Sequence, residues 1–456
     1  MNLEIPELSL VVLVGPAGCG KSTFAARHFR ATEVLESDAF RAMVADDPTD
    51  LEATADAFEV LHLAAAKRLA AGRLTVVDAT NVQARYRKPL VELARRHHCA
   101  PVAIVFDLPE GVCQAWNRQR GRTVPPQVVH RHAELLRRSL GRLEHEGFRV
   151  VHVLGSPDAI DQAVVTRQRR RVDRRDFHGP FDVVGDVHGC LDELLALLTK
   201  LGWEVADEPG AEGPGAAELE PTTGAPAGAA PRRLVRHPDG RTAVFLGDLV
   251  DRGPDTAGVL RLVMDMVADG AALCVAGNHE RKLLRALRGK KARIGRVLAE
   301  SLRQLGLQPP GFAERVTAFL DGLVSHYVLD RGRLVVAHAG LREDLQGRDS
   351  DEVRDFALYG QTTGETDEYG LPVRFEWARD YRGRAMVVYG HTPVPEPEWV
   401  NRTICVDTGC VFGGRLTALR YPERELVSVP ASRVHFQPRR PLDPPAGAEG
   451  AAPAGG

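Results

Sequence analysis

The chain has 456 residues, a formal net charge of -2 and seven cysteines. This length exceeds the usual size of one domain, so we expect two domains with separate cores. The near-neutral charge excludes a global attraction to nucleic acid or membranes, and a polyanion would have to be met by local patches. The cysteines are scattered without a Cys-x-x-Cys pair, and no apolar stretch is long enough to span a bilayer, which predicts a soluble cytoplasmic protein without membrane association.

A glycine-rich loop follows the first apolar run. Residues 8–14 form a β-rich run typical of a central strand in a parallel sheet. Residues 15–22 match the phosphate-binding loop, in which backbone N–H groups and a lysine surround phosphate oxygens and a hydroxyl binds Mg²⁺. The alternative is an ordinary glycine-rich turn, and the loop alone does not separate an ATPase, a GTPase and a kinase. The predicted nucleotide- and Mg²⁺-binding residues are Gly15, Gly18, Gly20, Lys21, Ser22 and Thr23.

A second short strand is predicted around residues 34–38, with Asp38 at its carboxyl end and Arg41 just beyond it. The carboxyl ends of parallel strands face the ligand crevice. Asp38 is therefore placed to take a proton from an acceptor hydroxyl, and Arg41 to offset charge on the transferred phosphoryl group or to hold an acceptor phosphate. The alternative, that Ser37 or Asp38 caps the next helix and Arg41 is solvated, stays open.

Two further segments of the first half carry candidate nucleotide-binding residues. Residues 74–78 are an apolar strand that ends in Asp78, whose carboxylate is expected to reach the Mg²⁺ ion or its water shell. A strand at 101–106 precedes a helical segment rich in arginine. Arg118 and Arg122 are predicted to belong to a lid over the triphosphate, with a solvated basic helix face as the alternative.

Composition marks the domain boundaries. A last strand near residues 151–154 and a short helix close the first domain, which we place at residues 1–165. Residues 166–178 are densely basic and are predicted to be a solvated linker or an interdomain salt-bridge strip, although such a run can also track a nucleic-acid backbone. Residues 207–231 and 431–456 are rich in glycine, alanine and proline, and we expect an inserted loop and a C-terminal tail.

Five short motifs in the second half each follow a β-rich run. They read Gly-Asp-Val-His-Gly, Gly-Asp-Leu-Val-Asp-Arg-Gly, Gly-Asn-His-Glu, His-Ala-Gly and Gly-His-Thr. Carboxylates, imidazoles and an amide that leave neighbouring strand ends converge on one point, where they supply the mixed ligands of a two-metal phosphatase. The predicted metal ligands are Asp186, His188, Asp248, Asn278, His338 and His391.

The motifs also predict a role for each side chain. Asp248 is the candidate bridge between two cations, with Asp186 and His188 on one cation and the remaining three ligands on the other. A water held between the cations would attack phosphorus in line. His279 is expected to protonate the leaving group, oriented by Asp251, while Arg252 binds phosphate oxygens. Mixed nitrogen and oxygen ligands favour Mn²⁺ or Ni²⁺, with iron and zinc as alternatives.

Both halves resemble the bacterial polynucleotide kinase-phosphatases, enzymes of RNA end repair. The resemblance covers about residues 8–420 and rests on the phosphate-binding loop, on Glu-Ser-Asp38 with Arg41, on Asp-Ala-Thr-Asn at residues 78–81, and on the five later motifs in the same order. It implies an α/β fold, in which an N-terminal P-loop kinase domain with a parallel sheet precedes a calcineurin-like metallophosphoesterase β-sandwich, flanked by helices, at residues 179–430.

The same resemblance implies residue roles and partners. Lys21 and Ser22 bind ATP and Mg²⁺, Asp38 activates a polynucleotide 5′-hydroxyl, and Arg41 contacts the phosphate that is transferred or received. Asp407 is added as a further residue of the phosphatase site. The longest family members end in a ligase module, which this chain does not show, so we expect a separate RNA ligase; the identity of a ligase or RNA methyltransferase partner and the oligomeric state stay open.

The expected function is the healing of broken RNA ends. A kinase would phosphorylate the 5′-hydroxyl, and a metal-dependent phosphatase would remove a 3′-phosphate or 2′,3′-cyclic phosphate. Two alternatives remain open at this point. In the first, the chain is a phosphatase that acts on proteins or on diadenosine tetraphosphate and carries a regulatory ATP-binding domain. In the second, it is a small-molecule kinase fused to a phosphatase.

Overall fold

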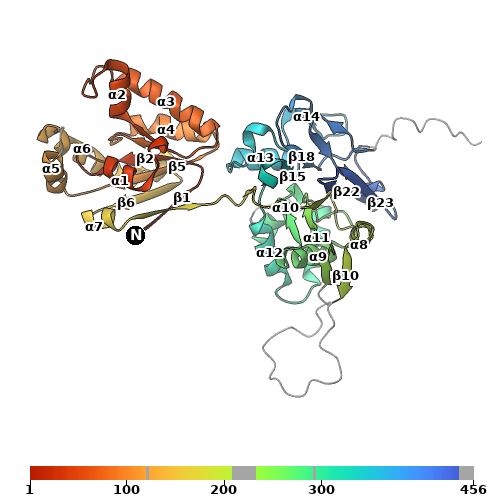
Figure 1. Ribbon diagram of the computed structural model, residues 1–456. Coiled ribbons are helices and arrows are strands. Elements are labelled where there is room, and N and C mark those ends of the chain that lie inside the picture. The colour runs from red at the N-terminus through yellow and green to blue at the C-terminus, as the bar shows by residue number, and fades with distance from the viewer. Residues whose placement is uncertain (120–122, 208–232, 291–293, 441–456) are drawn as a thin grey trace, which may run out of the picture. The chain divides into compact units, whose positions relative to one another are not determined.

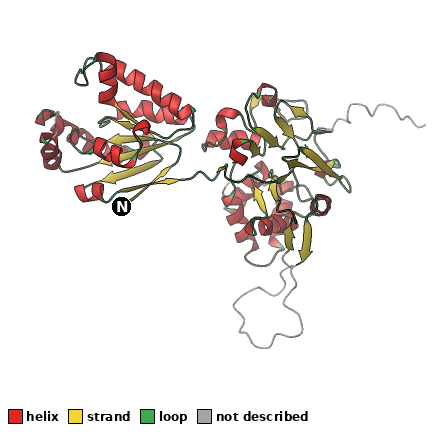
Figure 2. Ribbon diagram, in the orientation of Figure 1, coloured by secondary structure: helices red, strands yellow, loops and turns green. Residues whose placement is uncertain are grey.

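The protein divides into two compact units, which we describe separately. The computed structural model describes residues 1–119, 123–207, 233–290 and 294–440. The first unit is made mainly of residues 1–170, and the second begins at Arg171 (Figure 1). Helices cover strands in both units, so the α/β class predicted from the sequence is confirmed (Figure 2). Residues 208–231 of the predicted insertion and 441–456 of the predicted tail lie outside the described residues.

The first unit is built on a five-stranded parallel sheet of order β3-β4-β2-β5-β6. Alternate residues of the central strand β2 enter two apolar cores: Leu10 and Val12 face one, Val11 and Leu13 the other. Burial on both faces explains the continuous apolar run. The strands are β2 (Ser9–Val14), β3 (Val34–Glu36), β4 (Thr75–Asp78), β5 (Ala100–Phe106) and β6 (Val150–Leu154).

Helices connect these strands, and β2, β3 and β4 all end at the edge where the predicted nucleotide-binding residues begin. Proline in the first turn of α6 and α7 presets the helical φ, and Ser156 caps α7 by accepting a hydrogen bond from the Ala159 N–H at 3.1 Å. The helices are α1 (Lys21–His28), α2 (Ser37–Ala45), α3 (Thr54–Ala70), α4 (Ala84–Arg96), α5 (Glu110–Arg118), α6 (Pro126–Ser139) and α7 (Pro157–Asp161).

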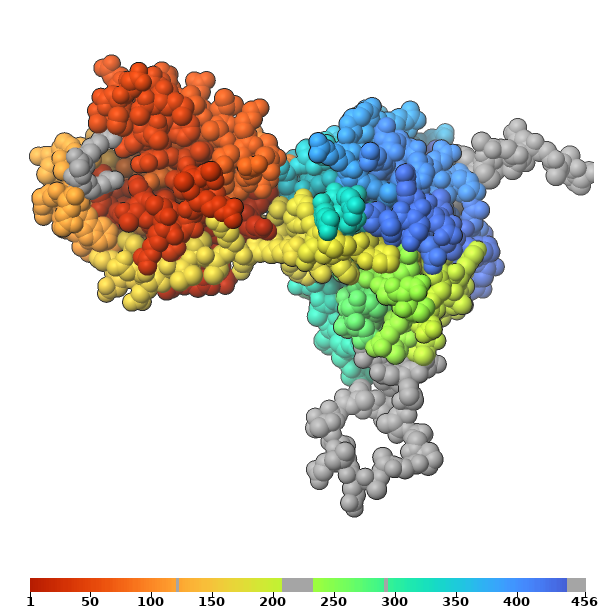
Figure 3. Space-filling view, viewed as in Figure 1, coloured from red at the N-terminus to blue at the C-terminus, as the bar shows by residue number. Residues whose placement is uncertain are grey.

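The basic segment 166–178 differs from the expected linker. Strand β7 (Val164–Gln168) pairs in parallel with β1 (Asn2–Pro6), so the red and yellow ends of this unit adjoin in the space-filling view (Figure 3). Arg167 forms a bidentate ion pair with Glu33, with N–O distances of 2.8 and 2.7 Å. Part of the basic run is therefore a strand whose arginine meets a carboxylate, which composition alone does not reveal.

The second unit contains two six-stranded sheets. The first has the order β13-β12-β9-β22-β21, with β23 paired to β22, and comprises β9 (Phe181–Val184), β12 (Thr242–Phe245), β13 (Ala272–Cys274), β21 (Asp407–Thr408), β22 (Arg415–Tyr421) and β23 (Glu425–Pro430). The second has the order β19-β20-β18-β15-β14-β8 and comprises β8 (Asp173–Arg174), β14 (His326–Leu329), β15 (Leu334–Ala337), β18 (Met386–Tyr389), β19 (Trp399–Val400) and β20 (Thr403–Cys405). Two hairpins lie outside these sheets: β10 (Glu204–Asp207) with β11 (Arg233–Arg236), and β16 (Thr362–Thr366) with β17 (Pro372–Arg374).

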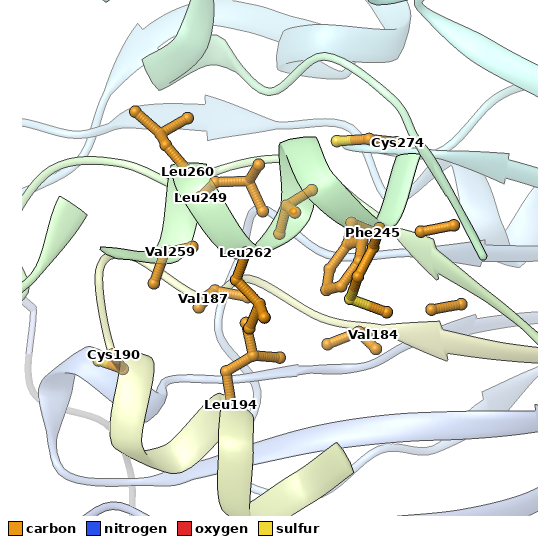
Figure 4. Close-up of a cluster of buried hydrophobic side chains, with 14 of the residues drawn as sticks. Val184, Val187, Cys190, Leu194, Phe245, Leu249, Val259, Leu260, Leu262 and Cys274 are labelled. Carbon is orange, nitrogen blue, oxygen red and sulfur yellow. The ribbon is translucent and has the colours of Figure 1, made fainter. Parts of the chain in front are cut away.

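The two sheets face each other across an apolar core, as the period-two pattern of their strands requires. Val244 of the first sheet and Val336 of the second belong to this core. Val184 and Phe245 point the other way, toward Leu194 of helix α8 (Leu191–Lys200), in the core under the helices (Figure 4). The predicted β-sandwich flanked by helices is thus confirmed.

The helices of the second unit lie on the outer faces of the sandwich, with apolar side chains of α13 against β15 and β18. No helix among the described residues is long and apolar enough to cross a membrane. The helices are α8 (Leu191–Lys200), α9 (Thr256–Ala268), α10 (Asn278–Leu287), α11 (Arg296–Gly306), α12 (Phe312–Gly322), α13 (Asp351–Tyr359) and α14 (Trp377–Asp380).

A buried arginine ties α4 to the loop that follows β4. Arg87 is fully buried and donates to both carboxylate oxygens of Glu146, at 2.7 and 2.6 Å. Its third nitrogen donates to the Asn81 carbonyl at 2.7 Å. Removing one partner of a buried ion pair leaves the other charge unpaired, which is why such losses are severe.

Replacing Arg87 by alanine is expected to lower the free energy of unfolding of the first unit by about 3–5 kcal/mol. Hydrogen-exchange mass spectrometry of the full chain should show faster exchange in peptides of β4 and α4, with peptides of the second unit unchanged. Arg85→Ala, at an exposed position of the same helix, is the matched control. Identical exchange in the two variants would contradict the role assigned to this ion pair.

Candidate functional site

The structure brings the six predicted metal ligands together in the second unit. They follow the carboxyl ends of β9, β12, β13, β15 and β18. Strands β9, β12 and β13 are mutually parallel, as are β15 and β18, so these ends meet at one edge of each sheet. His391 is half-buried and the other five ligands are buried: Asp186, His188, Asp248, Asn278 and His338.

Asp248 lies at the centre of the cluster. Its Oδ2 is 3.5 Å from His188 Nε2, and its Oδ1 is 3.4 Å from His338 Nε2. Two sets of side chains here offer ligand atoms at metal-binding separation, and Asp248 is common to both: His188, Asp248 and His279 form one, and Asp248, His338 and His391 the other. This arrangement matches a carboxylate that serves two cations.

Asn278 and Asp186 complete the cluster. Asn278 Oδ1 is 3.0 Å from His338 Nε2, and His391 Nδ1 is 2.8 Å from the same nitrogen. Asp186 Oδ2 accepts a hydrogen bond from the His391 N–H at 3.1 Å. This backbone contact joins Asp186 to a residue predicted for the other cation, and the assignment of Asp186 and His188 to one shell stays a prediction.

Backbone carbonyls orient two of the imidazoles. His188 Nδ1 lies 2.8 Å from the Val250 carbonyl, and His338 Nδ1 lies 3.0 Å from the Leu246 carbonyl. A carbonyl only accepts hydrogen bonds, so both rings carry their proton on Nδ1 and present the Nε2 lone pair to the cluster. Burial also lowers the pKa of His188, His338 and His391, which keeps these imidazoles neutral and able to bind a metal.

The charges and unsatisfied atoms fit divalent cations. Burial and the charges of Asp407 and Asp248 raise the pKa of Asp186, and burial together with Asp248 raises the pKa of Asp407 to about 6. Asp186 Oδ1 and His391 Nε2 are buried and make no hydrogen bond to any described residue. Cations would relieve both features. Bound there, they would supply Lewis-acid chemistry, activating water and neutralising charge on a phosphate.

Three further predicted residues lie beside the cluster. His279 Nδ1 is 2.6 Å from Asp251 Oδ2, which is the orienting hydrogen bond expected from the sequence, and His279 Nε2 is 3.9 Å from Asp248 Oδ2. A ring held in this way can donate a proton from Nε2 to a leaving oxygen. Arg252 places Nη1 2.6 Å from His188 Nε2 and lies over the Phe412 ring at 5.3 Å, so its guanidinium faces the same cluster.

Strained backbone surrounds the site. Five predicted site residues have a positive φ, which is unusual for residues other than glycine: His188, Asp248, Asp251, Arg252 and His391. Gly247 and Gly277 are required here because a Cβ on either one would collide with the backbone of the other loop. The surrounding structure must therefore hold these loops in place.

Glu280 holds these loops in place, although the sequence analysis assigned it no role. Its buried carboxylate accepts hydrogen bonds from the N–H groups of Asp248 at 2.7 Å, Leu249 at 2.8 Å and Gly277 at 2.9 Å. Burial and the charge of Asp248 raise the pKa of Glu280 to about 8. Its place in the Gly-Asn-His-Glu motif is the signal that points to it.

A second buried cluster lies next to the site. Cys190, Glu193 and Cys410 offer atoms at metal-binding separation. Glu193 Oε1, however, already accepts hydrogen bonds from the Ser432 hydroxyl at 2.7 Å and from His435 Nε2 at 2.9 Å. These bonds anchor the segment after β23 to α8 and account for the buried carboxylate without a metal.

In the first unit, the predicted phosphate-binding loop joins β2 to α1. Lys21 is buried and donates from Nζ to the carbonyls of Gly15 at 3.0 Å and Pro16 at 2.7 Å. Gly18 has a φ of 79°, and a Cβ there would collide with the Cys113 carbonyl. Ser22 and Thr23 lie in the first turn of α1, Ser22 half-buried and Thr23 exposed, with Gly20 directly before the helix.

The acidic residues of the first unit lie at the same edge of the sheet. Asp78 is buried at the end of β4, opposite Glu36 at the end of β3. Asp38 is in the first turn of α2, where its carboxylate contacts the Arg41 guanidinium. Arg41 also donates to the Pro48 carbonyl at 3.2 Å. The alternative of a solvated Arg41 is therefore wrong: its side chain is 12% exposed, against 42% for Asp38.

The predicted lid is only partly described. Arg118 is exposed at the end of α5, and Arg122 lies outside the described residues. Asn117, to which the sequence analysis gave no role, is buried and pairs with Val124: its Nδ2 donates to the Val124 carbonyl at 2.7 Å, and its Oδ1 accepts from the Val124 N–H at 3.1 Å.

Comparisons with known proteins agree with this architecture. A family model described as calcineurin-like phosphoesterase matches residues 179–421. The chain belongs to the calcineurin-like phosphoesterases. A second model, described as an AAA domain, matches residues 10–143. The chain is thus a phosphoesterase with a kinase-like P-loop domain, and the family implies divalent metal ions at the site just described.

Several relatives resemble the chain over part of its length. It is 43% identical over 258 residues to bis(5′-nucleosyl)-tetraphosphatase PrpE of Geobacillus thermodenitrificans, covering 56% of this chain and 95% of that protein. It is 42% identical over 267 residues to the protein of the same name from Bacillus subtilis, covering 58% and 99%. A solved protein serine/threonine phosphatase of Saccharomyces cerevisiae is 14% identical, with a TM-score of 0.32 over 58% of this chain and 81% of that chain.

These relatives refine the expectation from sequence. The kinase-like and phosphoesterase modules are both present, but the two bacterial relatives are named tetraphosphatases and not polynucleotide kinase-phosphatases. Each match covers too little of the chain to include both modules. The specific resemblance to RNA end-repair enzymes therefore remains a prediction.

Above pH 8, where Glu280 is ionised, its replacement by glutamine is expected to lower the free energy of unfolding of the second unit by roughly 3 kcal/mol, because an amide would place N–H donors against backbone N–H donors. Scanning calorimetry of the full chain would measure this loss. Glu314→Gln, an exposed position on α12, should change nothing. A Glu280→Gln protein as stable as wild type would refute the loop-holding role.

Metal affinity is expected to fall as the pH drops below about 6. Asp407 binds a proton there, because its pKa is raised to about 6, and that proton competes with a cation. The histidines do not add to this competition, because burial lowers their pKa. Calorimetric Mn²⁺ titrations over a pH series should show the dependence, and Asp407→Asn should weaken it without removing it, because the pKa of Asp186 is raised as well. An affinity that is constant across pH 6 would contradict the account.

Proposed function

We propose that this chain heals RNA ends. Its kinase-like domain would transfer the γ-phosphate of ATP, with Mg²⁺, to a 5′-hydroxyl. Its phosphoesterase domain, with Mn²⁺ or Ni²⁺, would remove a 3′-phosphate or a 2′,3′-cyclic phosphate. The observation that carries the proposal is the contact between Asp38 and Arg41 at the same sheet edge as the phosphate-binding loop, because a hydrolase domain with only a regulatory nucleotide has no need of an acceptor-activating pair.

The geometry of this pair suits an acceptor. Asp38 lies two residues after the end of β3, in the first turn of α2, and β3 lies beside β4, which ends in Asp78. The Asp38 side chain is partly exposed, so a hydroxyl can reach it, whereas Arg41 is largely covered and fixed by the Pro48 carbonyl. A base open to the acceptor and an arginine held beside it are the groups that phosphoryl transfer to an alcohol uses.

A second candidate is hydrolysis of dinucleoside tetraphosphates, with the P-loop domain as a regulatory module. The names of the relatives from Geobacillus thermodenitrificans and Bacillus subtilis favour it for the phosphoesterase domain. The two candidates use the same metal centre and differ in what the kinase-like domain does. Product ends bearing a 5′-phosphate and a 3′-hydroxyl are what an RNA ligase joins, so the first candidate includes a separate ligase partner.

The deciding experiment offers γ-labelled ATP and two substrates in parallel: an oligoribonucleotide with a 5′-hydroxyl and a 3′-phosphate, and diadenosine tetraphosphate. Label transfer to the 5′ end should be abolished by Lys21→Ala and fall at least about 100-fold in Asp38→Asn, while 3′-phosphate release continues. Asp248→Asn should abolish 3′-phosphate release, while label transfer to the 5′ end continues. Arg30→Ala, an exposed position outside the motifs, is the control.

Each outcome points to one candidate. Transfer to the oligonucleotide that depends on Lys21 and Asp38 supports end healing. Tetraphosphate cleavage without any label transfer refutes it and supports the second candidate. Loss of both activities in Lys21→Ala with an intact fold would contradict the separation of the two chemistries.

A further inference from the structure

The carboxylate of Asp251 is held from both sides. Its Oδ2 is 2.6 Å from His279 Nδ1, and its Oδ1 accepts a hydrogen bond from the Ser301 hydroxyl at 2.6 Å. All three side chains are buried, with exposed fractions of 2% for Asp251, 6% for His279 and 1% for Ser301. Bulk water therefore cannot replace the serine hydroxyl without a local rearrangement.

Ser301 reaches the site from α11, which lies outside the five motifs. One turn further along this helix, Gln304 Oε1 accepts a hydrogen bond from the Thr256 N–H at 2.8 Å, and Gln304 Nε2 donates to the Pro254 carbonyl at 3.2 Å. Side chains three residues apart share one face of a helix. Hydrogen bonds from this face of α11 therefore fix the loop 251–256 at both ends.

The loop needs such support. Asp251 has a φ of 70° and Arg252 a φ of 72°, a conformation that persists only when the surroundings impose it. If the Asp251 carboxylate turns, His279 Nδ1 loses its acceptor and the ring is no longer fixed with Nε2 toward the metal cluster. A misplacement of about 1 Å in a reacting group can cost about 100-fold in rate.

We propose that Ser301 is a positioning residue for leaving-group protonation, the outer member of a Ser301–Asp251–His279 relay. Ser301 touches neither the substrate nor the cations. It fixes the rotamer of Asp251, and Asp251 accepts the Nδ1–H of the His279 imidazolium and fixes the direction of the ring. The imidazolium donates its Nε2 proton to the leaving oxygen as the P–O bond breaks and becomes the neutral ring, with its remaining proton on Nδ1. The inference depends on phosphoesterase chemistry and the acid role of His279, and not on which phosphate ester is the natural substrate.

Leaving-group dependence tests this role. A nitrophenolate needs little protonation as it departs, whereas the alkoxide left by a nucleoside 3′-monophosphate needs a full proton. With the Mn²⁺-loaded full chain, Ser301→Ala should lower kcat on the nucleotide about tenfold and change kcat on p-nitrophenyl phosphate by less than about twofold, with KM unchanged on both. A purely structural serine would slow both substrates equally.

Three controls sharpen the result. Ser301→Thr retains the hydroxyl and should restore most of the nucleotide activity. Arg303→Ala, exposed on the same helix, should match wild type. In a His279→Ala background, adding Ser301→Ala should have no further effect, because both changes act through one proton donor. Should Ser301→Ala not fold, Ser301→Cys keeps the volume and weakens the hydrogen bond, and it gives the same comparison.

A second readout does not need turnover. In the metal-free protein, the proton on His279 Nδ1, bonded to Asp251, should give a downfield NMR signal that weakens in Ser301→Ala and persists in Ser301→Thr. Equal loss of kcat on both phosphate esters, an unchanged nucleotide kcat, or an unchanged NMR signal in Ser301→Ala would overturn the proposal.

Discussion

The phosphoesterase site depends on the capture of backbone N–H groups by the Glu280 carboxylate. This buried side chain holds the turn after β12 and the turn before α10 with one group. Asp248 is thereby kept in a left-handed conformation with its carboxylate between two sets of imidazoles. The packed sandwich offsets the strain of this backbone, and backbone N–H donors offset the crowded negative charge at Asp186, Asp248 and Glu280.

The two units build their candidate sites in the same way. Each places polar side chains at the carboxyl ends of buried parallel strands, where backbone groups are free to bind a ligand. In the first unit this edge carries a phosphate-binding loop, Asp78 and the contact between Asp38 and Arg41. In the second it carries the metal cluster. The two sites share no residue.

Sequence patterns anticipated the parts of both sites that are local. Asp186, Asp248 and His338 follow apolar strands directly, so strand position and motif spacing alone predicted their convergence. The parts that could not be predicted come from segments that reach the site, or their ion-pair partners, only through tertiary packing. Ser301 and Gln304 lie on an amphipathic helix with no motif, and Arg167 is one arginine of a basic run until β7 brings it to Glu33. The composition of these segments does not predict which residues they contact.

The shared role of Asp248 is the central claim, and anomalous diffraction from crystals grown with Mn²⁺ tests it most directly. The account predicts two manganese peaks that share an Asp248 carboxylate contact, one on the side of His188 and the other on the side of His338 and His391. A single peak, or two peaks of which one has no contact with Asp248, would contradict it.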